Sequence, residues 1–100
     1  MKIEGQAALV TGGDSGLGEA TARELARLGA KVAVLDVNLE GAQRVASDIG
    51  GIGLKCDVTD TASVQAAIDA AAAAHGPARI LMNIAGIGTA KRVVQKDGSA

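Results

Sequence analysis

Short apolar runs and amphipathic segments alternate along this chain. The apolar runs lie at residues 7–11, 31–36, 52–56 and 79–83, and each is bounded by polar or glycine-containing segments typical of strand ends. Helical segments are predicted between them, from apolar spacing over 15–28, at about 39–48, and over the alanine-rich stretch 61–75. The pattern therefore predicts the element order β-α-β-α-β-α-β.

This alternation is typical of an α/β fold of the Rossmann type, a doubly wound parallel sheet with right-handed crossovers. The run KVAVLD at 31–36 is almost continuously apolar, as expected for a strand buried on both faces of such a sheet. Thr59 or Asp60 can cap the third helix, and Gly76 and Pro77 end it. Because the last predicted strand would need a further neighbour, we expect the chain to be part of a larger protein.

Composition and charge narrow the classes of function. The net charge is −1 with basic residues spread along the chain, which removes the electrostatic footprint of a nucleic-acid or membrane-surface binder. The chain contains no Phe, Trp or Tyr, so it has no ring to stack on a base and no tyrosine to donate a proton. Because neither a signal peptide nor a long apolar run is present, we expect a cytoplasmic protein.

Two residues of chemically reactive type are assigned structural roles. Cys56 is the only cysteine, cannot form an internal disulfide, and lies in a predicted buried strand, so it is expected to act as a small core residue. His75 ends the third predicted helix, where a cation is favourable, and is expected to cap it. Neither has metal-ligand spacing, and no metal site is expected.

Three glycines follow the first predicted strand and open the first predicted helix. Gly12, Gly16 and Gly18 are spaced G-x-x-x-G-x-G, and glycine there permits a positive φ, close approach of backbone N–H groups to an anion, and close packing of helix on strand. The helix N-terminus adds a partial positive charge, so a pyrophosphate is the expected ligand. A glycine-rich turn that binds nothing is the alternative. A Walker-type phosphate loop is disfavoured because Glu19, and not a lysine, follows the glycines.

Asp36 ends the second predicted strand, 20 residues after Gly16. A carboxylate there can accept hydrogen bonds from both ribose hydroxyls of an adenosine and repels a 2′-phosphate, so the sequence predicts NAD as cofactor in preference to NADP. Simple capping of the strand end is the alternative. Asp14 adds a second negative charge inside the loop, and we expect no basic residue to offset either carboxylate.

Four ordered motifs resemble those of the short-chain dehydrogenase/reductase family: TGGDSGLG at 11–18, LDV at 35–37, CDVTD at 56–60 and NIAG at 83–86. The resemblance extends over the whole chain, with Ile84 replacing the second asparagine of the family's N-N-A-G motif. The cofactor-binding residues that it implies are Gly12, Ser15, Gly16, Leu17, Gly18, Asp36, Val37, Asp57, Val58, Asn83, Ile84, Ala85 and Gly86.

Several of these residues also have a physical interpretation from their place in the predicted sheet. Asp57, at the carboxyl end of the third strand, can accept a hydrogen bond from the adenine amino group or, alternatively, cap the third helix. Asn83 leaves the fourth strand beside the first, where its amide can tie the two strands together, support the cofactor, or both. Ala85 and Gly86 would keep the floor of the cofactor site small, and Ile84 would offer backbone groups and an apolar surface to the ribose.

The resemblance implies an oxidoreductase that transfers a hydride between NAD and a secondary alcohol or ketone. The family's catalytic Asn, Ser and Tyr-x-x-x-Lys are expected beyond residue 100, so residues 1–100 would be the NAD-binding portion of a single-domain enzyme, with no catalytic residue of their own. Family members are commonly tetramers, and we expect a homotetramer of the full-length protein. A truncated, non-catalytic nucleotide-binding protein is the alternative.

A narrower resemblance lies in the segment 86–100, GIGTAKRVVQKDGSA. It is similar to the basic loop after the fourth strand in bacterial relatives of type-2 3-hydroxyacyl-CoA dehydrogenase, also called 17β-hydroxysteroid dehydrogenase type 10. Together with Asp36 it favours an (S)-3-hydroxyacyl-CoA as the small-molecule substrate. Lys91, Arg92 and Lys96 would attract the CoA phosphates or simply be solvated. A steroid, a sugar or a simple secondary alcohol is the alternative substrate.

Overall fold

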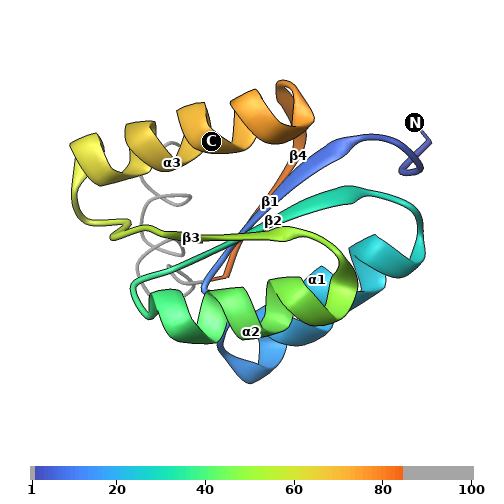
Figure 1. Ribbon diagram of the computed structural model, residues 1–100, viewed down its shortest axis with the longest axis horizontal. Helices are drawn as coiled ribbons and strands as arrows, with labels where there is room; N and C mark the ends of the chain where they lie inside the picture. The colour runs from blue at the N-terminus through green and yellow to red at the C-terminus, as the bar shows by residue number, and fades with distance from the viewer. Residues whose placement is uncertain (1, 85–100) are drawn as a thin grey trace, which may run out of the picture.

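The structure, a computed structural model, describes residues 2–84 of the chain. The four strands form one parallel sheet in the order β3-β2-β1-β4. Helices α1 and α2 cover one face of this sheet, and α3 covers the other (Figure 1). The predicted α/β fold with a Rossmann-type parallel sheet is confirmed. In chain order, the elements are β1 (Ala7–Thr11), α1 (Gly16–Arg27), β2 (Lys31–Asp36), α2 (Leu39–Ile49), β3 (Ile52–Lys55), α3 (Thr61–His75) and β4 (Ala78–Asn83).

The ends of several elements differ from the prediction by one residue. Strand β3 stops at Lys55, before Cys56, and β4 begins at Ala78. Helix α1 begins at Gly16 because Ser15 is its N-cap and stays extended, with φ −77° and ψ 161°. Asp60, and not Thr59, caps α3, because its carboxylate accepts hydrogen bonds from the free N–H groups of the first turn.

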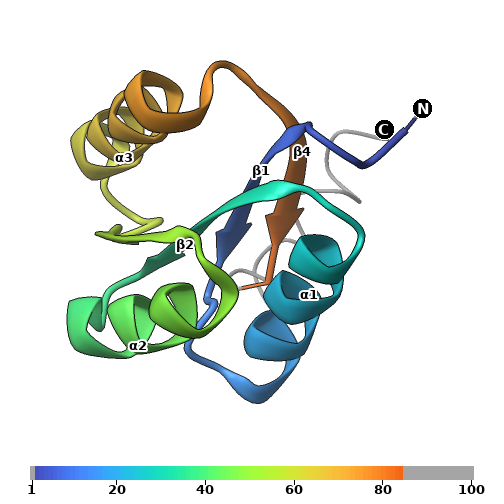
Figure 2. The same cartoon turned by 45° about the vertical axis from the view of Figure 1, so that its right-hand side comes forward.

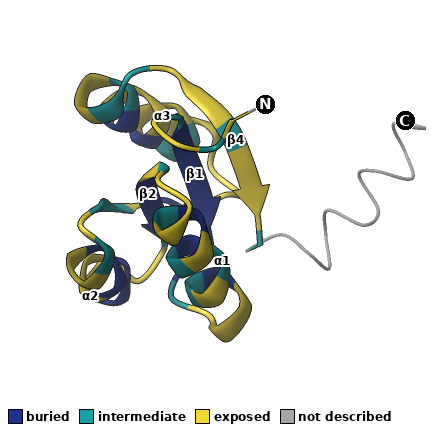
Figure 3. Ribbon diagram, turned by 90° about the vertical axis from the view of Figure 1, so that its right-hand side faces the viewer, coloured by how far each residue is buried: buried dark blue, intermediate teal, exposed yellow. Residues whose placement is uncertain are grey.

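The central strands are buried on both faces, whereas β4 is largely exposed (Figure 3). Because side chains alternate between the faces of a strand, β1 and β2 contribute to two separate apolar clusters. The cluster under α1 and α2 contains Ala8, Val10, Ala22, Leu25, Val32, Val34, Ala42, Val45 and Ala46. The cluster under α3 contains Leu9, Ala33, Leu35, Cys56, Ala67 and Ala71. These two clusters fix β1 and β2 as the rigid centre of the sheet.

The strand order creates a switch point at the carboxyl end of β1. β2 and β4 pair with β1 on opposite sides, and the chain reaches β4 by crossing from β3 through α3. The carboxyl ends of β1 and β4 consequently lie side by side at one edge of the sheet (Figure 2). In open parallel sheets a crevice forms outside the strand ends at such a point, and ligands bind there.

Candidate functional site

The turn between β1 and α1 gives each glycine of the loop a different role. Gly12 has a φ of 71°, the left-handed conformation that turns the chain out of β1. A Cβ on Gly18 would lie 2.9 Å from the Cα of Gly13, so the absence of a side chain lets α1 pack directly on the turn. A Cβ on Gly16 would meet no atom within 4 Å. The fold thus explains Gly12 and Gly18, whereas Gly16 leaves its backbone open to a ligand.

The N-terminus of α1 presents free N–H groups beside this open space. The Ser15 hydroxyl accepts a hydrogen bond from the N–H of Gly18 (3.1 Å) and donates one to the carbonyl of Gly12 (2.7 Å). Within residues 2–84, the N–H groups of Gly16 and Leu17 have no acceptor. Leu17 is 56% exposed and leaves this end of the helix uncovered by the core. Free N–H groups at a helix N-terminus bind anions, so the geometry suits a phosphate group.

The Asp36 carboxylate lies next to the glycine loop, at the carboxyl end of β2. Its Oδ2 accepts a hydrogen bond from the N–H of Asp14 (3.1 Å), and its Oδ1 accepts one from the N–H of Asn38 (2.9 Å). Because each carboxylate oxygen has a second lone pair, Asp36 retains capacity for two neighbouring hydroxyl groups. Val37 follows Asp36 in the chain, is 60% exposed, and offers an apolar surface next to the carboxylate.

The expectation that no basic residue offsets the loop carboxylates is wrong for Asp14. The Nη2 atom of Arg44, on α2, lies 3.4 Å from Asp14 Oδ1, and the Asn38 amide donates a hydrogen bond to Asp14 Oδ2 (2.9 Å). The same Arg44 nitrogen lies 3.4 Å from Oε1 of Glu19, and hydrogen bonds from Arg23 and then Arg44 hold the pKa of Glu19 below its ordinary value. The charge of Asp14 is therefore engaged by α2.

Asp57 and Val58 follow β3 at the same edge of the sheet. Asp57 Oδ1 accepts hydrogen bonds from the hydroxyl (2.6 Å) and the N–H (2.9 Å) of Thr59, and these bonds, the hydroxyl first, lower the pKa of the Asp57 carboxyl. The alternative that Asp57 caps the third helix is wrong, because Asp60 occupies that position. Val58 is 38% exposed and offers a small apolar surface.

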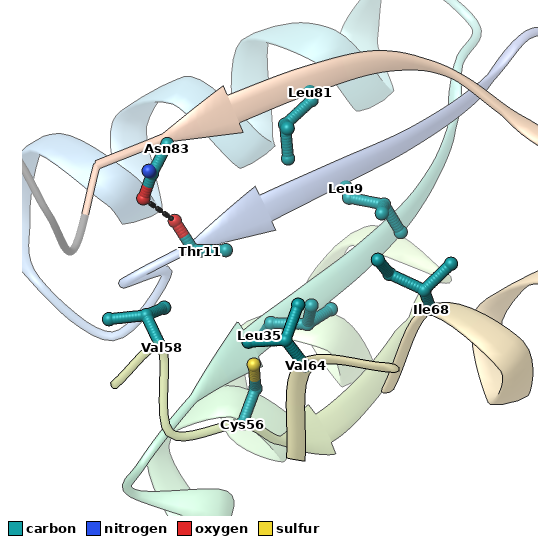
Figure 4. A pocket seen from close by; sticks show the side chains of 9 residues that line it. All are labelled: Leu9, Thr11, Leu35, Cys56, Val58, Val64, Ile68, Leu81 and Asn83. Atoms are coloured by element: carbon teal, nitrogen blue, oxygen red, sulfur yellow. Dashed lines mark hydrogen bonds between the residues drawn. The ribbon is translucent and has the colours of Figure 1, made fainter. Parts of the chain in front are cut away.

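Asn83 lies beside Thr11, where β4 and β1 end. The Thr11 hydroxyl donates a hydrogen bond to Asn83 Oδ1 (2.7 Å), as Figure 4 shows. The N–H of Ile84 donates one to the Thr11 carbonyl (3.2 Å). Asn83 therefore ties the two strands together. In the described part of the chain its Nδ2 makes no hydrogen bond, so it can still donate to a ligand. Ala85 and Gly86, and the basic residues of segment 86–100, lie outside the described residues.

A cavity of about 200 Å³ opens on the face of the sheet that α3 covers (Figure 4). Most of its wall is apolar, and it reaches the carboxyl edge of the sheet at Thr11, Val58 and Asn83. Cys56 lines it and is only 2% exposed, and burial, followed by the charge of Asp57, raises the pKa of its thiol. A buried thiol with a raised pKa is a weak nucleophile, which agrees with the predicted core role.

The remaining reactive side chains add no further chemistry to this edge. Gly76 is the C-cap of α3, so His75 is the last helical residue and not the cap that we expected. Among residues 2–84, no group of three or more His, Cys, Asp and Glu side chains is arranged to hold a metal ion. The helices in this part of the chain are too short or too polar to cross a membrane.

No role in the site was assigned from the sequence to four residues that shape it: Thr11, Asn38, Arg44 and Thr59. Asn38 carried a local signal, because asparagine directly before an amphipathic segment is a favoured N-cap. Thr11 and Thr59 act through hydrogen bonds that depend on strand-end geometry. Arg44 carried no local signal, since its partner Asp14 is 30 residues away in the sequence.

Comparison with known proteins shows which proteins this chain is similar to. Residues 6–99 match the family model of the short chain dehydrogenases. The chain is 48% identical to D-threitol dehydrogenase of Mycolicibacterium smegmatis and 40% identical to the mitochondrial borneol dehydrogenase of Lavandula x intermedia, over 87% and 91% of its length. It covers 35% of each of these proteins, so it spans about a third of their length.

A solved structure with the same fold is 3-ketoacyl-(acyl-carrier-protein) reductase from Brucella melitensis complexed with NADH. The two proteins share 42% sequence identity and superpose with a TM-score of 0.77, over 79% of this chain and 34% of the reductase. The parallel sheet, the glycine loop at its switch point and the family match lead to one conclusion: the chain belongs to the short chain dehydrogenase family.

Proposed function

We propose that this chain is the cofactor-binding portion of an NAD-dependent oxidoreductase of secondary alcohols and ketones. The proposal rests on two features that occur together at this loop: the free N–H groups of Gly16 and Leu17, and the Asp36 carboxylate on the other side of the loop. A diphosphate and a ribose diol need these complementary groups. The NADH complex of the Brucella reductase, a protein with 42% identity, supports a nicotinamide cofactor.

The arrangement suggests how each side chain would contribute. The diphosphate would lie over the α1 N-terminus, and the adenosine ribose would bind the free lone pairs of Asp36. Val37 and Val58 would flank the adenine, and Asp57 would accept a hydrogen bond from its amino group. Asn83 would support the cofactor through its free Nδ2, followed by Ile84, Ala85 and Gly86 along the ribose.

NAD, when bound, supplies the hydride acceptor. The residues described here hold and orient it, and none of them is assigned a proton-transfer role. Residues 1–100 would thus form the NAD-binding portion of a larger single-domain enzyme, whose catalytic Ser, Tyr and Lys lie outside this chain. The family resemblance further supports a homotetramer, which light scattering of the full-length protein would test. A cytoplasmic location remains our proposal from the sequence, and cell fractionation would test it.

For the substrate, we propose a small molecule with a secondary alcohol or ketone. An (S)-3-hydroxyacyl-CoA is the narrower candidate, supported by the resemblance of segment 86–100 and by the ketoacyl substrate named for the Brucella reductase. The D-threitol and borneol dehydrogenases favour instead a polyol or a terpene alcohol. Initial rates with one alcohol of each class would rank the three, and failure with all of them would contradict the proposed activity.

Calorimetric titration of the full-length enzyme with NAD and NADP tests the cofactor. We expect tighter binding of NAD. Replacing Asp36 with Ala should weaken NAD binding about tenfold to a hundredfold, because one charge-assisted hydrogen bond contributes roughly 1.5–3 kcal/mol. Asp36→Asn is the matched control for charge, since it keeps the shape and removes the repulsion of a 2′-phosphate. The proposal would be contradicted if NADP bound more tightly than NAD, or if neither cofactor bound.

A further inference from the structure

Asp14 joins three segments of the cofactor edge. Its N–H donates to Asp36 Oδ2 (3.1 Å), while its carboxylate accepts from the Asn38 amide (2.9 Å) and lies 3.4 Å from Arg44. The residue therefore connects the glycine loop to the end of β2 through its backbone and to the first turns of α2 through its side chain. A loop residue held at both backbone and side chain has little freedom to move.

Gly41 makes room for this carboxylate. A Cβ on Gly41 would overlap the carboxyl group of Asp14, including both of its oxygens. Gly41 has no positive φ to explain its identity and lies inside the first turn of α2, where glycine is less favourable than alanine. The space above Gly41 is thus used by the Asp14 side chain. A carboxylate near the N-terminus of a helix is also favoured by the helix dipole.

Asp36 depends on this connection for its orientation. Its two oxygens are held by the N–H groups of Asp14 and Asn38, one on each side. Asn38 in turn is the N-cap of α2, accepting from the N–H of Gly41 (3.2 Å), and donates its amide to Asp14. Loss of the Asp14 side chain would release the loop from α2 and, with it, one of the two groups that fix the Asp36 carboxylate.

We infer that Asp14 is a positioning residue for the cofactor, which holds Asp36 and the glycine loop in the arrangement that selects NADH over NADPH. This inference rests on the proposed binding of NAD. Asp14 acts through Asp36 and touches no reacting atom. A negative charge in the glycine loop would be unfavourable if it pointed toward a bound diphosphate. The Asp14 carboxylate points instead to α2, where it accepts a hydrogen bond from Asn38 and pairs with Arg44.

The test compares the dissociation constants of NADH and NADPH, by calorimetry, for the full-length wild type, Asp14→Ala, Gly41→Ala and Asp14→Asn. Gly41→Ala leaves Asp14 and Asp36 chemically intact and displaces only the carboxylate of Asp14. We expect both alanine variants to weaken NADH binding about three- to tenfold, the effect of one lost hydrogen bond. The ratio of the NADPH to the NADH dissociation constant should fall by the same factor in both variants. Asp14→Asn should bind within about twofold of wild type, because its amide oxygen still accepts from Asn38.

Glu40→Ala is the matched control, since it removes an exposed carboxylate from the same turn of α2 and should leave the ratio unchanged. Both constants are measured on the same folded protein, so their ratio does not depend on the fraction folded. A lower unfolding temperature of Asp14→Ala with an unchanged ratio would overturn the inference, as would an equal effect of Glu40→Ala. A wild type that does not prefer NADH would overturn the proposed function as well. If the preference for NADH depends on Asp36 but is unchanged in Asp14→Ala and Gly41→Ala, the inference is overturned and the proposed function stands.

Discussion

The two glycines at the start of α1 should respond oppositely to alanine. At Gly18 the new Cβ would approach the carbonyl group of Gly12 and lie 2.9 Å from the Cα of Gly13, all backbone atoms that cannot rotate away. Overpacking of this kind costs about 1–3 kcal/mol, against a gain of about 1 kcal/mol in helix propensity. Because the clashing atoms belong to the backbone, the overpacking cost should lie at the upper end of this range, and we expect Gly18→Ala to lower the free energy of unfolding by about 2 kcal/mol.

At Gly16 the new Cβ meets no atom, so Gly16→Ala should be as stable as wild type or slightly more stable. Its methyl group would, however, occupy the space that we assign to the diphosphate. Loss of one hydrogen bond to a charged group predicts binding of NADH about tenfold to a hundredfold weaker.

Urea denaturation of the full-length protein and calorimetric titration with NADH measure the two effects separately. Ala20→Gly, at an exposed position of α1, is the control for helix propensity alone and should cost about 1 kcal/mol without weakening binding. Wild-type affinity for NADH in Gly16→Ala would contradict the role of Gly16, and wild-type stability of Gly18→Ala would contradict the close packing at Gly18.

Three further residues at the same edge, Thr59, Thr11 and Cys56, can be tested through their hydrogen bonds and burial. Thr59→Val removes the hydroxyl that chiefly lowers the pKa of Asp57, so a carboxyl carbon NMR titration should show that pKa rising toward its ordinary value; an unchanged pKa would contradict this assignment. A lowered Asp57 pKa stabilises the fold at pH values above the ordinary pKa of an aspartate. The difference in stability between wild type and Thr59→Val should therefore vanish as the pH falls through the folded-state pKa of Asp57, which denaturation at a series of acid pH values would measure. Thr11→Val breaks the bond to Asn83 and should cost about 0.5–1.5 kcal/mol in urea denaturation, whereas no change would show that the strands need no such tie. Cys56 should react with a thiol reagent no faster than the protein unfolds, and rapid native-state reaction would show an accessible thiol.

Local rules were sufficient for the architecture and for the glycine loop. The apolar runs predicted all four strands, most clearly β1 and β2, which are apolar almost throughout because they are buried on both faces. The spacing of Gly12, Gly16 and Gly18 likewise predicted the turn, the open backbone and the close helix packing, and the structure has all three. Each of these features depends on residues that are close together in the sequence.

Features that depend on tertiary contacts could not be predicted in this way. Thr59 and Asp60 are both good N-caps, and the sequence does not choose between them; in the structure the Thr59 hydroxyl donates to Asp57, and Asp60 caps α3. The charge of Asp14 looked unexplained because its partners, Asn38 and Arg44, are 24 and 30 residues away. Side-chain direction, which periodicity does not encode, decides such pairs.

A crystal structure of the full-length enzyme with NADH would test the proposed cofactor site most directly. We expect diphosphate oxygens within about 2.7–3.2 Å of the backbone nitrogens of Gly16 and Leu17. We expect both hydroxyls of the adenosine ribose to lie within hydrogen-bond distance of the Asp36 carboxylate. A diphosphate bound away from the α1 N-terminus, or a ribose that does not contact Asp36, would contradict the proposed site.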